Sequence, residues 1–216
     1  MTSFPSPNVA AFDAAFARCP LVAILRGVRP DEVEGIGDVL VDAGFTLIEV
    51  PLNSPDPFGS IALLARRVAG RAAVGAGTVL RVGDVAAVQA AGGTIVISPN
   101  ANPAVIAATV SAGLVSLPGV ATPTEAFAAL DAGAQALKLF PAESHSPAVL
   151  KAMLAVLPRG LRVLPVGGVS PELMAPWTAA GAAGFGLGSA LYKPGMDAAE
   201  VGRRAAGFIA AWRSPS

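Results

Sequence analysis

The chain is poor in the residues that form disulfides and most metal sites. Its 216 residues include one cysteine, Cys19, and one histidine, His145. A lone cysteine excludes an intrachain disulfide, which fits an intracellular compartment better than a secreted one, and a free thiol of this kind is expected to be buried. A single histidine without clustered ligands argues against a metal site of the usual histidine and carboxylate type. His145 itself is expected to lie in a solvated loop rather than against a substrate.

Charged residues and long apolar runs are also scarce. Charged residues make up 14% of the chain, and the 15 basic and 15 acidic residues cancel, so no net field attracts nucleic acid or an anionic membrane. Glycine and proline interrupt every apolar stretch before the roughly 18 residues that a membrane span requires. The N-terminal segment lacks a basic start, and Asp13 interrupts its apolar residues, which argues against a signal peptide. We expect a cytoplasmic protein that binds neither nucleic acid nor membrane.

The sequence does contain a regular alternation of short apolar runs and alanine-rich segments of helical period. Six Ala-Gly steps, from Ala43-Gly44 to Ala180-Gly181, are predicted to end helices, and prolines such as those in Asn102-Pro103 and Ser170-Pro171 to begin them. The pattern predicts one domain, residues 1–216, with a (β/α)8 TIM-barrel fold and a short capping helix at about residues 8–18. The eight predicted strands are residues 22–26, 46–52, 72–79, 94–99, 115–120, 134–141, 162–169 and 184–191. An open doubly wound sheet is the alternative, but the G-x-G-x-x-G turn typical of that fold does not follow the first strand.

One of only three lysines, Lys138, lies inside an apolar run, Gln135 to Pro141, that is predicted to be a buried strand. Charged side chains are almost never fully buried without compensation, and burial lowers the pKa of an ammonium group. The resulting neutral amine is the nucleophile of Schiff-base chemistry. Lys138 is therefore the candidate nucleophile.

Glu49 is the only carboxylate set in the apolar core of a predicted strand, within Leu47 to Leu52. Burial raises a carboxyl pKa toward the range of a general acid and base. The alternative is a structural ion pair between Glu49 and Lys138. Such pairs are costly to desolvate, however, and perturbed groups in a cleft more often mark function.

Residues at the carboxyl ends of the strands form the active site in a barrel of this kind. Arg26 ends the first strand, and its planar guanidinium suits a substrate carboxylate, although a salt bridge at the rim fits its position equally well. Thr78 follows two glycines at the end of the third strand and can donate a hydrogen bond to a ligand. The glycine-rich segments Val166 to Val169 and Gly186 to Ser189 end strands seven and eight. They predict a phosphate site, unless both are only tight turns.

Seven short motifs follow one another between about Pro20 and Tyr192: Arg26-Gly27, Glu49-Val50-Pro51-Leu52-Asn53-Ser54-Pro55, Gly75-Ala76-Gly77-Thr78-Val79, Ser98-Pro99-Asn100, Pro118-Gly119, Leu137-Lys138-Leu139-Phe140-Pro141 and Val166-Gly167-Gly168-Val169. Together they resemble the KDPG/KHG aldolase family. The resemblance implies that Lys138 forms the Schiff base and that Glu49 accepts and donates protons. It further implies that no metal or organic cofactor takes part, and it suggests a homotrimer. The binding residues that it implies are Arg26 and Thr78 for the substrate carboxylate, and Gly167, Gly168, Gly188 and Ser189 for the phosphate.

The resemblance also implies a substrate, a phosphorylated keto sugar acid that is cleaved to pyruvate and D-glyceraldehyde 3-phosphate. Family members specific for the gluconate-derived epimer carry an arginine after their Glu-Val-Thr-Leu run and a threonine before Gly-Gly. This chain has Asn53 and Val166 there. Arg26 can replace the missing arginine, and the missing threonine removes a hydroxyl that could contact the C4 group. Both changes predict the 2-dehydro-3-deoxy-6-phosphogalactonate epimer, with Pro99 as a third specificity position; the gluconate epimer is the alternative.

Two other functions are compatible with the residues alone. A phosphate-binding isomerase or epimerase would share the loops after strands seven and eight, although its metal-dependent form would need several histidines. A non-catalytic barrel that binds sugar phosphates would keep Lys138 and Glu49 as a salt bridge. Chelator-insensitive lyase activity would separate the aldolase from the isomerase, and turnover that is lost in Lys138→Ala would exclude the binding protein.

Overall fold

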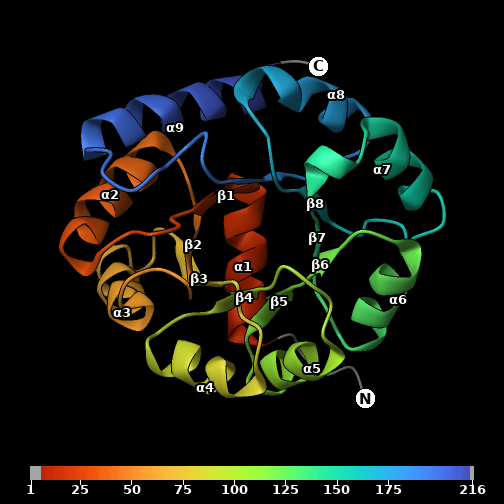
Figure 1. Ribbon diagram of the computed structural model, residues 1–216, viewed down its shortest axis with the longest axis horizontal. Coiled ribbons are helices and arrows are strands. Elements are labelled where there is room, and N and C mark those ends of the chain that lie inside the picture. The colour runs from red at the N-terminus through yellow and green to blue at the C-terminus, as the bar shows by residue number, and fades with distance from the viewer. Residues whose placement is uncertain (1–5, 215–216) are drawn as a thin grey trace.

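Parallel strands surrounded by helices form the computed structural model, which describes residues 6–214 (Figure 1). Helices α2 to α9 lie around the outside in this view, and α1 crosses the centre. None of the described helices is both long and apolar enough to cross a membrane. The helices are α1 (Pro7–Arg18), α2 (Pro30–Ala43), α3 (Pro57–Arg67), α4 (Val82–Ala90), α5 (Pro103–Ser111), α6 (Pro123–Asp131), α7 (Pro147–Leu154), α8 (Met174–Ala179) and α9 (Ala198–Arg213), with 3-10 turns η1 (Ala142–Ser144) and η2 (Pro171–Leu173).

The strands form two parallel sheets. The larger is a curled half-barrel with the order β5-β4-β3-β2-β1-β9, and the smaller has the order β6-β7-β8. Only Pro118 separates β5 from β6, and one isolated parallel bridge, Val166 to Gly186, links the end of β8 to β9. The strands are β1 (Leu21–Ile24), β2 (Leu47–Pro51), β3 (Ala73–Gly77), β4 (Ile95–Ile97), β5 (Val115–Leu117), β6 (Gly119–Val120), β7 (Leu137–Leu139), β8 (Val163–Pro165) and β9 (Phe185–Leu187).

The predicted α/β class is confirmed, since each of the eight predicted strand segments overlaps an observed strand. The segment 115–120 holds two strands instead of one. Pro118 lacks a backbone N–H for a ladder hydrogen bond, so the pairing changes sheets at this residue. Closure of the two sheets into a complete eight-stranded barrel stays a prediction.

Side chains along each strand alternate between an inner and an outer hydrophobic cluster. In β2, Leu47 packs in the inner cluster and Ile48 in the outer cluster beneath the helices, so the next residue, Glu49, points inward. In β7, Leu137 belongs to the outer cluster, so Lys138 points inward as well. Burial on both faces explains why the strands read as nearly continuous apolar runs.

Helix α1 packs against the amino ends of the strands. Its Phe12 and Phe16 are buried in the inner cluster. Thr46, directly before β2, donates its hydroxyl to the carbonyl oxygen of Ala15 at 2.7 Å. The helix therefore covers the amino ends and leaves the carboxyl ends of the strands for a ligand.

The helix boundaries follow the signals in the sequence. Prolines begin α2, α5 and α6 as predicted, and the side chain of Asn102 accepts a hydrogen bond from the first turn of α5. Ser170-Pro171 begins the 3-10 turn η2 instead of an α-helix. All six predicted capping glycines have the positive φ that favours this residue: Gly44, Gly70, Gly92, Gly113, Gly133 and Gly181.

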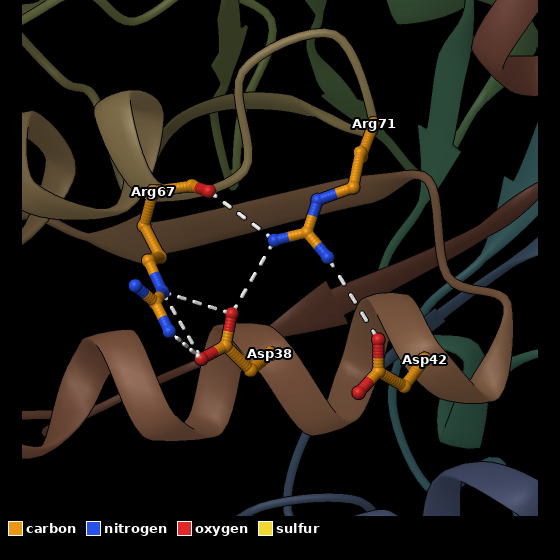
Figure 2. A network of polar contacts seen from close by, with 4 residues as sticks. All are labelled: Asp38, Asp42, Arg67 and Arg71. Carbon is orange, nitrogen blue, oxygen red and sulfur yellow. Dashed lines mark hydrogen bonds and ion pairs between the residues drawn. The ribbon is translucent and has the colours of Figure 1, made fainter.

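An ion-pair network joins α2 to the end of α3 on the outer surface (Figure 2). Arg67 donates to Asp38 at 2.7 Å, and this hydrogen bond holds the pKa of Asp38 below its usual value. Arg71 adds a contact to Asp38 at 3.3 Å and lies 3.8 Å from Asp42. Because Arg67 ends α3 and Arg71 precedes β3, the network lies toward the amino ends of the strands.

Candidate functional site

Lys138 and Glu49 line the same interior space. Lys138, on β7, is 6% exposed, and Glu49, on β2, is 1% exposed. The space is small, about 10 Å³, and the rest of its wall is apolar: Val22, Ile24, Ile97, Leu117, Leu164, Val166 and Gly186. The inward positions of two different sheets thus bring together the two charged residues that the sequence sets in apolar strands.

Burial shifts the pKa of both side chains toward their neutral forms. Removal from water raises the pKa of Glu49 above 4.5, and the charges of Lys138 and Arg26 oppose this rise. Removal from water likewise lowers the pKa of Lys138 below 10.5; Glu49 opposes this change and Arg26 adds to it. A neutral amine can attack a carbonyl carbon, and a carboxyl group with a raised pKa can exchange protons near neutral pH.

Lys138 and Glu49 do not form an ion pair with each other in residues 6–214. Glu49 Oε2 is buried and has no hydrogen-bond partner in that range, and Lys138 Nζ lies 4.7 Å from the centre of the Phe140 ring. Gly77, on the neighbouring strand β3, leaves room for the carboxylate, because a Cβ at this position would overlap it. Because these two buried side chains form no ion pair with each other, the arrangement favours a ligand site over a structural ion pair.

A cleft of about 790 Å³ opens at the carboxyl ends of β1, β7, β8 and β9 and reaches Lys138. Lys138 also lines the inner space, so its side chain is shared by the cleft and by the space that Glu49 lines. The cleft is lined by Ile24, Arg26, Gly27, Lys138, Phe140, Glu143, Val166, Gly167, Gly168, Val169, Ser170, Gly186, Gly188, Ser189, Ala190, Tyr192, Lys193, Pro194 and Arg204.

Only some of the predicted carboxylate and specificity residues line the cleft. Arg26 lines the cleft, and its Nη1 donates a hydrogen bond of 2.6 Å to Asn53 Oδ1. Asn53 therefore orients Arg26 instead of lining the cleft itself. Thr78 is half-buried directly after β3 with a φ of 56°, and neither Thr78 nor Pro99 lines the cleft or the inner space. Val166 lines both.

All four predicted phosphate residues line the cleft: Gly167, Gly168, Gly188 and Ser189. Gly167 and Gly168 have φ values of 114° and 62°, a backbone conformation that a side chain would strain. Glu143, in η1, packs over this pair, since a Cβ at either glycine would contact its side chain. The backbone of this segment is therefore exposed to the cleft beside one carboxylate.

The sequence interpretation gave no role in the site to six polar or aromatic residues of the cleft: Phe140, Glu143, Ser170, Tyr192, Lys193 and Arg204. Phe140 and Glu143 follow the strand of Lys138, so reading every carboxyl-end loop to its full length would have found them. Lys193 lies in the loop after β9, and Arg204 lies on α9, where no motif marks either residue.

The one cysteine and the one histidine of the chain lie outside the cleft. Cys19 is buried as expected, and burial raises the pKa of its thiol. His145 lies in the loop between η1 and α7, as expected, and is half-buried: its Nδ1 lies 3.0 Å from the Pro141 carbonyl oxygen and its Nε2 lies 3.0 Å from that of Ala121. In the part of the chain that the structure describes, no three His, Cys, Asp or Glu residues are grouped so that they could hold a metal ion.

Comparison with known proteins identifies the family. The model for "KDPG and KHG aldolase" matches residues 12–204. The chain belongs to the KDPG and KHG aldolase family. A relative from Rhizobium meliloti (strain 1021), named "Probable 2-dehydro-3-deoxy-6-phosphogalactonate aldolase", is 49% identical over 193 residues, which cover 89% of this chain and 91% of the relative. The 2-dehydro-3-deoxy-6-phosphogalactonate aldolase of Escherichia coli (strain K12) is 45% identical over 91% of this chain and 96% of its own.

Solved structures of the KDPG and KHG aldolase family share the fold. The structure named "Native KDPGal structure" is 45% identical, with a TM-score of 0.89 over 91% of this chain and 95% of its own. The 2-keto-3-deoxy-6-phospho-gluconate aldolase from Zymomonas mobilis ATCC 29191 is 27% identical, with a TM-score of 0.82 over 92% of this chain and 96% of its own. The arrangement of helices and strands that places Lys138 and Glu49 is therefore that of an aldolase family.

Proposed function

We propose that this family member cleaves 2-dehydro-3-deoxy-6-phosphogalactonate to pyruvate and D-glyceraldehyde 3-phosphate through a Schiff base. One observation carries the chemistry: the buried Lys138 lines both the cleft and the inner space that holds the buried Glu49 carboxylate, and the two side chains form no ion pair in the described residues. The relatives that are 49% and 45% identical are named for this substrate.

The reaction begins when the Lys138 amine attacks the C2 ketone. Loss of water leaves an iminium that withdraws electrons from the C3–C4 bond. Glu49, directly or through water, takes the proton of the C4 hydroxyl; the C3–C4 bond breaks, and the C4 fragment leaves as the aldehyde. The remaining enamine takes a proton at C3, which Glu49 can return. Water then hydrolyses the iminium to pyruvate and the free amine.

Substrate binding in this proposal uses both ends of the keto acid. Arg26 and Thr78 hold the carboxylate, and the phosphate binds at Gly167, Gly168, Gly188 and Ser189. The position of Arg26 and of the four phosphate residues supports this assignment, because they line the same cleft as Lys138. Thr78 follows Gly77, where a Cβ would overlap the Glu49 carboxylate. A phosphate bound far from the reacting carbons holds the ketone beside the amine at a high effective concentration.

The choice of epimer depends on Asn53, Val166 and Pro99. We expect kcat/KM for the galactonate-derived substrate to exceed that for its gluconate-derived C4 epimer by about tenfold or more, because one hydroxyl contact changes in the transition state. The measurement is the initial rate of pyruvate release from each purified epimer. Equal rates would contradict the specificity role of these three residues, and no pyruvate from either epimer would refute the proposed function.

The proposal includes one domain, residues 1–216, in which the two sheets close into a single eight-stranded barrel. The continuous passage from β5 to β6 through Pro118 and the parallel bridge between Val166 and Gly186 support this closure. The surrounding helices in Figure 1 also cover both sheets.

We also propose a homotrimer, in agreement with the prediction from the family resemblance. Exposed apolar side chains on three successive helices and the segment before them support contact between copies: Leu80, Val82, Val110 and Phe127. Burial of such side chains in a subunit interface is favourable. Light scattering is expected to give three times the 21.5 kDa mass of one chain, and a stable monomer would contradict this assembly.

A further inference from the structure

Four cationic side chains line the cleft: Arg26, Lys138, Lys193 and Arg204. We propose that Lys193 supplies the positive charge that balances the substrate phosphate and thereby sets the preference for phosphorylated over unphosphorylated keto acids. This inference rests on the proposed function. It adds a side chain to a phosphate site that otherwise consists of three glycines and a serine.

Three of the four cations are otherwise engaged. Lys138 reacts with the ketone in the proposed mechanism, and Arg26, just beyond the carboxyl end of β1, donates a hydrogen bond to Asn53. Arg204 lies within 2.7 Å of Glu200 and also donates to the Ala190 carbonyl oxygen. Arg204 therefore already has a carboxylate partner, which it shares with Arg203.

Lys193 is exposed and has no ion-pair partner among residues 6–214. Contacts on both sides fix its backbone. Tyr192 is 2% exposed and donates its hydroxyl to Glu32 at 2.7 Å, and a Cβ added at Gly27 would lie only 2.6 Å from Pro194 Cγ. A flexible ammonium group on an anchored loop, four residues beyond Ser189, can reach the phosphate without ordering a mobile segment.

The glycine site needs such a charge because a carboxylate lies beside it. Glu143 packs over Gly167 and Gly168, where the backbone amides provide dipoles but no net charge. A phosphate dianion bound there would be repelled by Glu143. A cation on the cleft wall offsets this repulsion, and Lys193 is the cleft cation that has neither an ion-pair partner in residues 6–214 nor another role in the proposed reaction.

The test compares Lys193→Met with Lys151→Met. Lys151 is exposed on α7, outside the cleft, so its substitution removes the same charge without touching the site. The measured quantity is kcat/KM for the phosphorylated keto acid divided by that for its unphosphorylated form. We expect Lys193→Met to lower this ratio about tenfold, mainly through KM, because a charge-assisted contact to phosphate is lost. Lys193→Arg should restore most of the ratio, and Lys151→Met should leave it unchanged.

The outcomes separate this inference from the proposed function. An unaltered chain that shows no preference for the phosphorylated substrate would refute the phosphate site itself. A preference that persists in Lys193→Met would overturn the role of Lys193 and leave the aldolase intact. A loss in Lys193→Met that Lys193→Arg does not restore would indicate a packing role for the side chain and would also overturn the inference.

Discussion

Lys138→Ala is expected to lower kcat/KM by at least about 10³-fold, because no other amine of residues 6–214 lines the inner space to form the iminium. Steady-state cleavage of the phosphorylated keto acid measures this loss. Lys151→Ala is the matched control, since it removes an exposed lysine from α7 and should retain full activity. A Lys138→Ala variant that keeps more than about a tenth of the activity would contradict the Schiff-base mechanism.

The pH dependence of the first step follows from the burial of Lys138. Burial lowers the pKa of this amine below 10.5, so its neutral fraction at a given pH exceeds that of an exposed lysine. The rate of imine formation should therefore rise with pH and reach a plateau, and the midpoint of this rise should lie below pH 10.5. Single-turnover rates across the alkaline range give this midpoint.

Glu49→Gln is expected to lower kcat by about 10²- to 10⁴-fold, the usual contribution of a positioned general acid and base. KM should change little, because Glu49 lies in the inner space and not on the wall of the cleft. The amide has nearly the shape of the carboxyl group, so packing is preserved. A variant with normal kcat would exclude Glu49 as the proton acceptor.

The same substitution has a predicted effect on stability. Burial raises the pKa of Glu49, so the folded chain holds a proton that the unfolded chain releases as the pH rises through the ordinary carboxyl range. The contribution of Glu49 to the free energy of unfolding therefore falls as the pH rises. Because glutamine does not titrate, the stability of Glu49→Gln relative to the unaltered chain should increase from acid to neutral pH, as thermal unfolding at both values would show.

Much of the site could be predicted because its residues break the pattern of their strands. A charged side chain in an apolar run, as at Glu49 and Lys138, is visible in the sequence, and the period of two places both on the inner face. The glycine pair Gly167-Gly168 is visible for a similar reason, since its backbone conformation excludes most side chains.

The rest depends on contacts between segments that no local pattern encodes. The hydrogen bond from Arg26 to Asn53 joins the ends of β1 and β2. From the sequence, Asn53 marks only the loss of an arginine that would bind the carboxylate, whereas in the structure it orients Arg26. The change of sheets at Pro118 depends on the neighbours available to β5 and β6. Lys193 and Glu143 enter the site from loops, whose paths follow from packing rather than from periodicity.

Reductive trapping tests whether Lys138 forms the covalent intermediate. The protein is incubated with pyruvate, reduced with borohydride, digested and analysed by mass spectrometry, with a sample lacking pyruvate as the control. We predict loss of activity together with one pyruvate-derived adduct, located on the peptide that contains Lys138. An active preparation that is inactivated without modification of Lys138, or an adduct confined to Lys151 or Lys193, would contradict the mechanism.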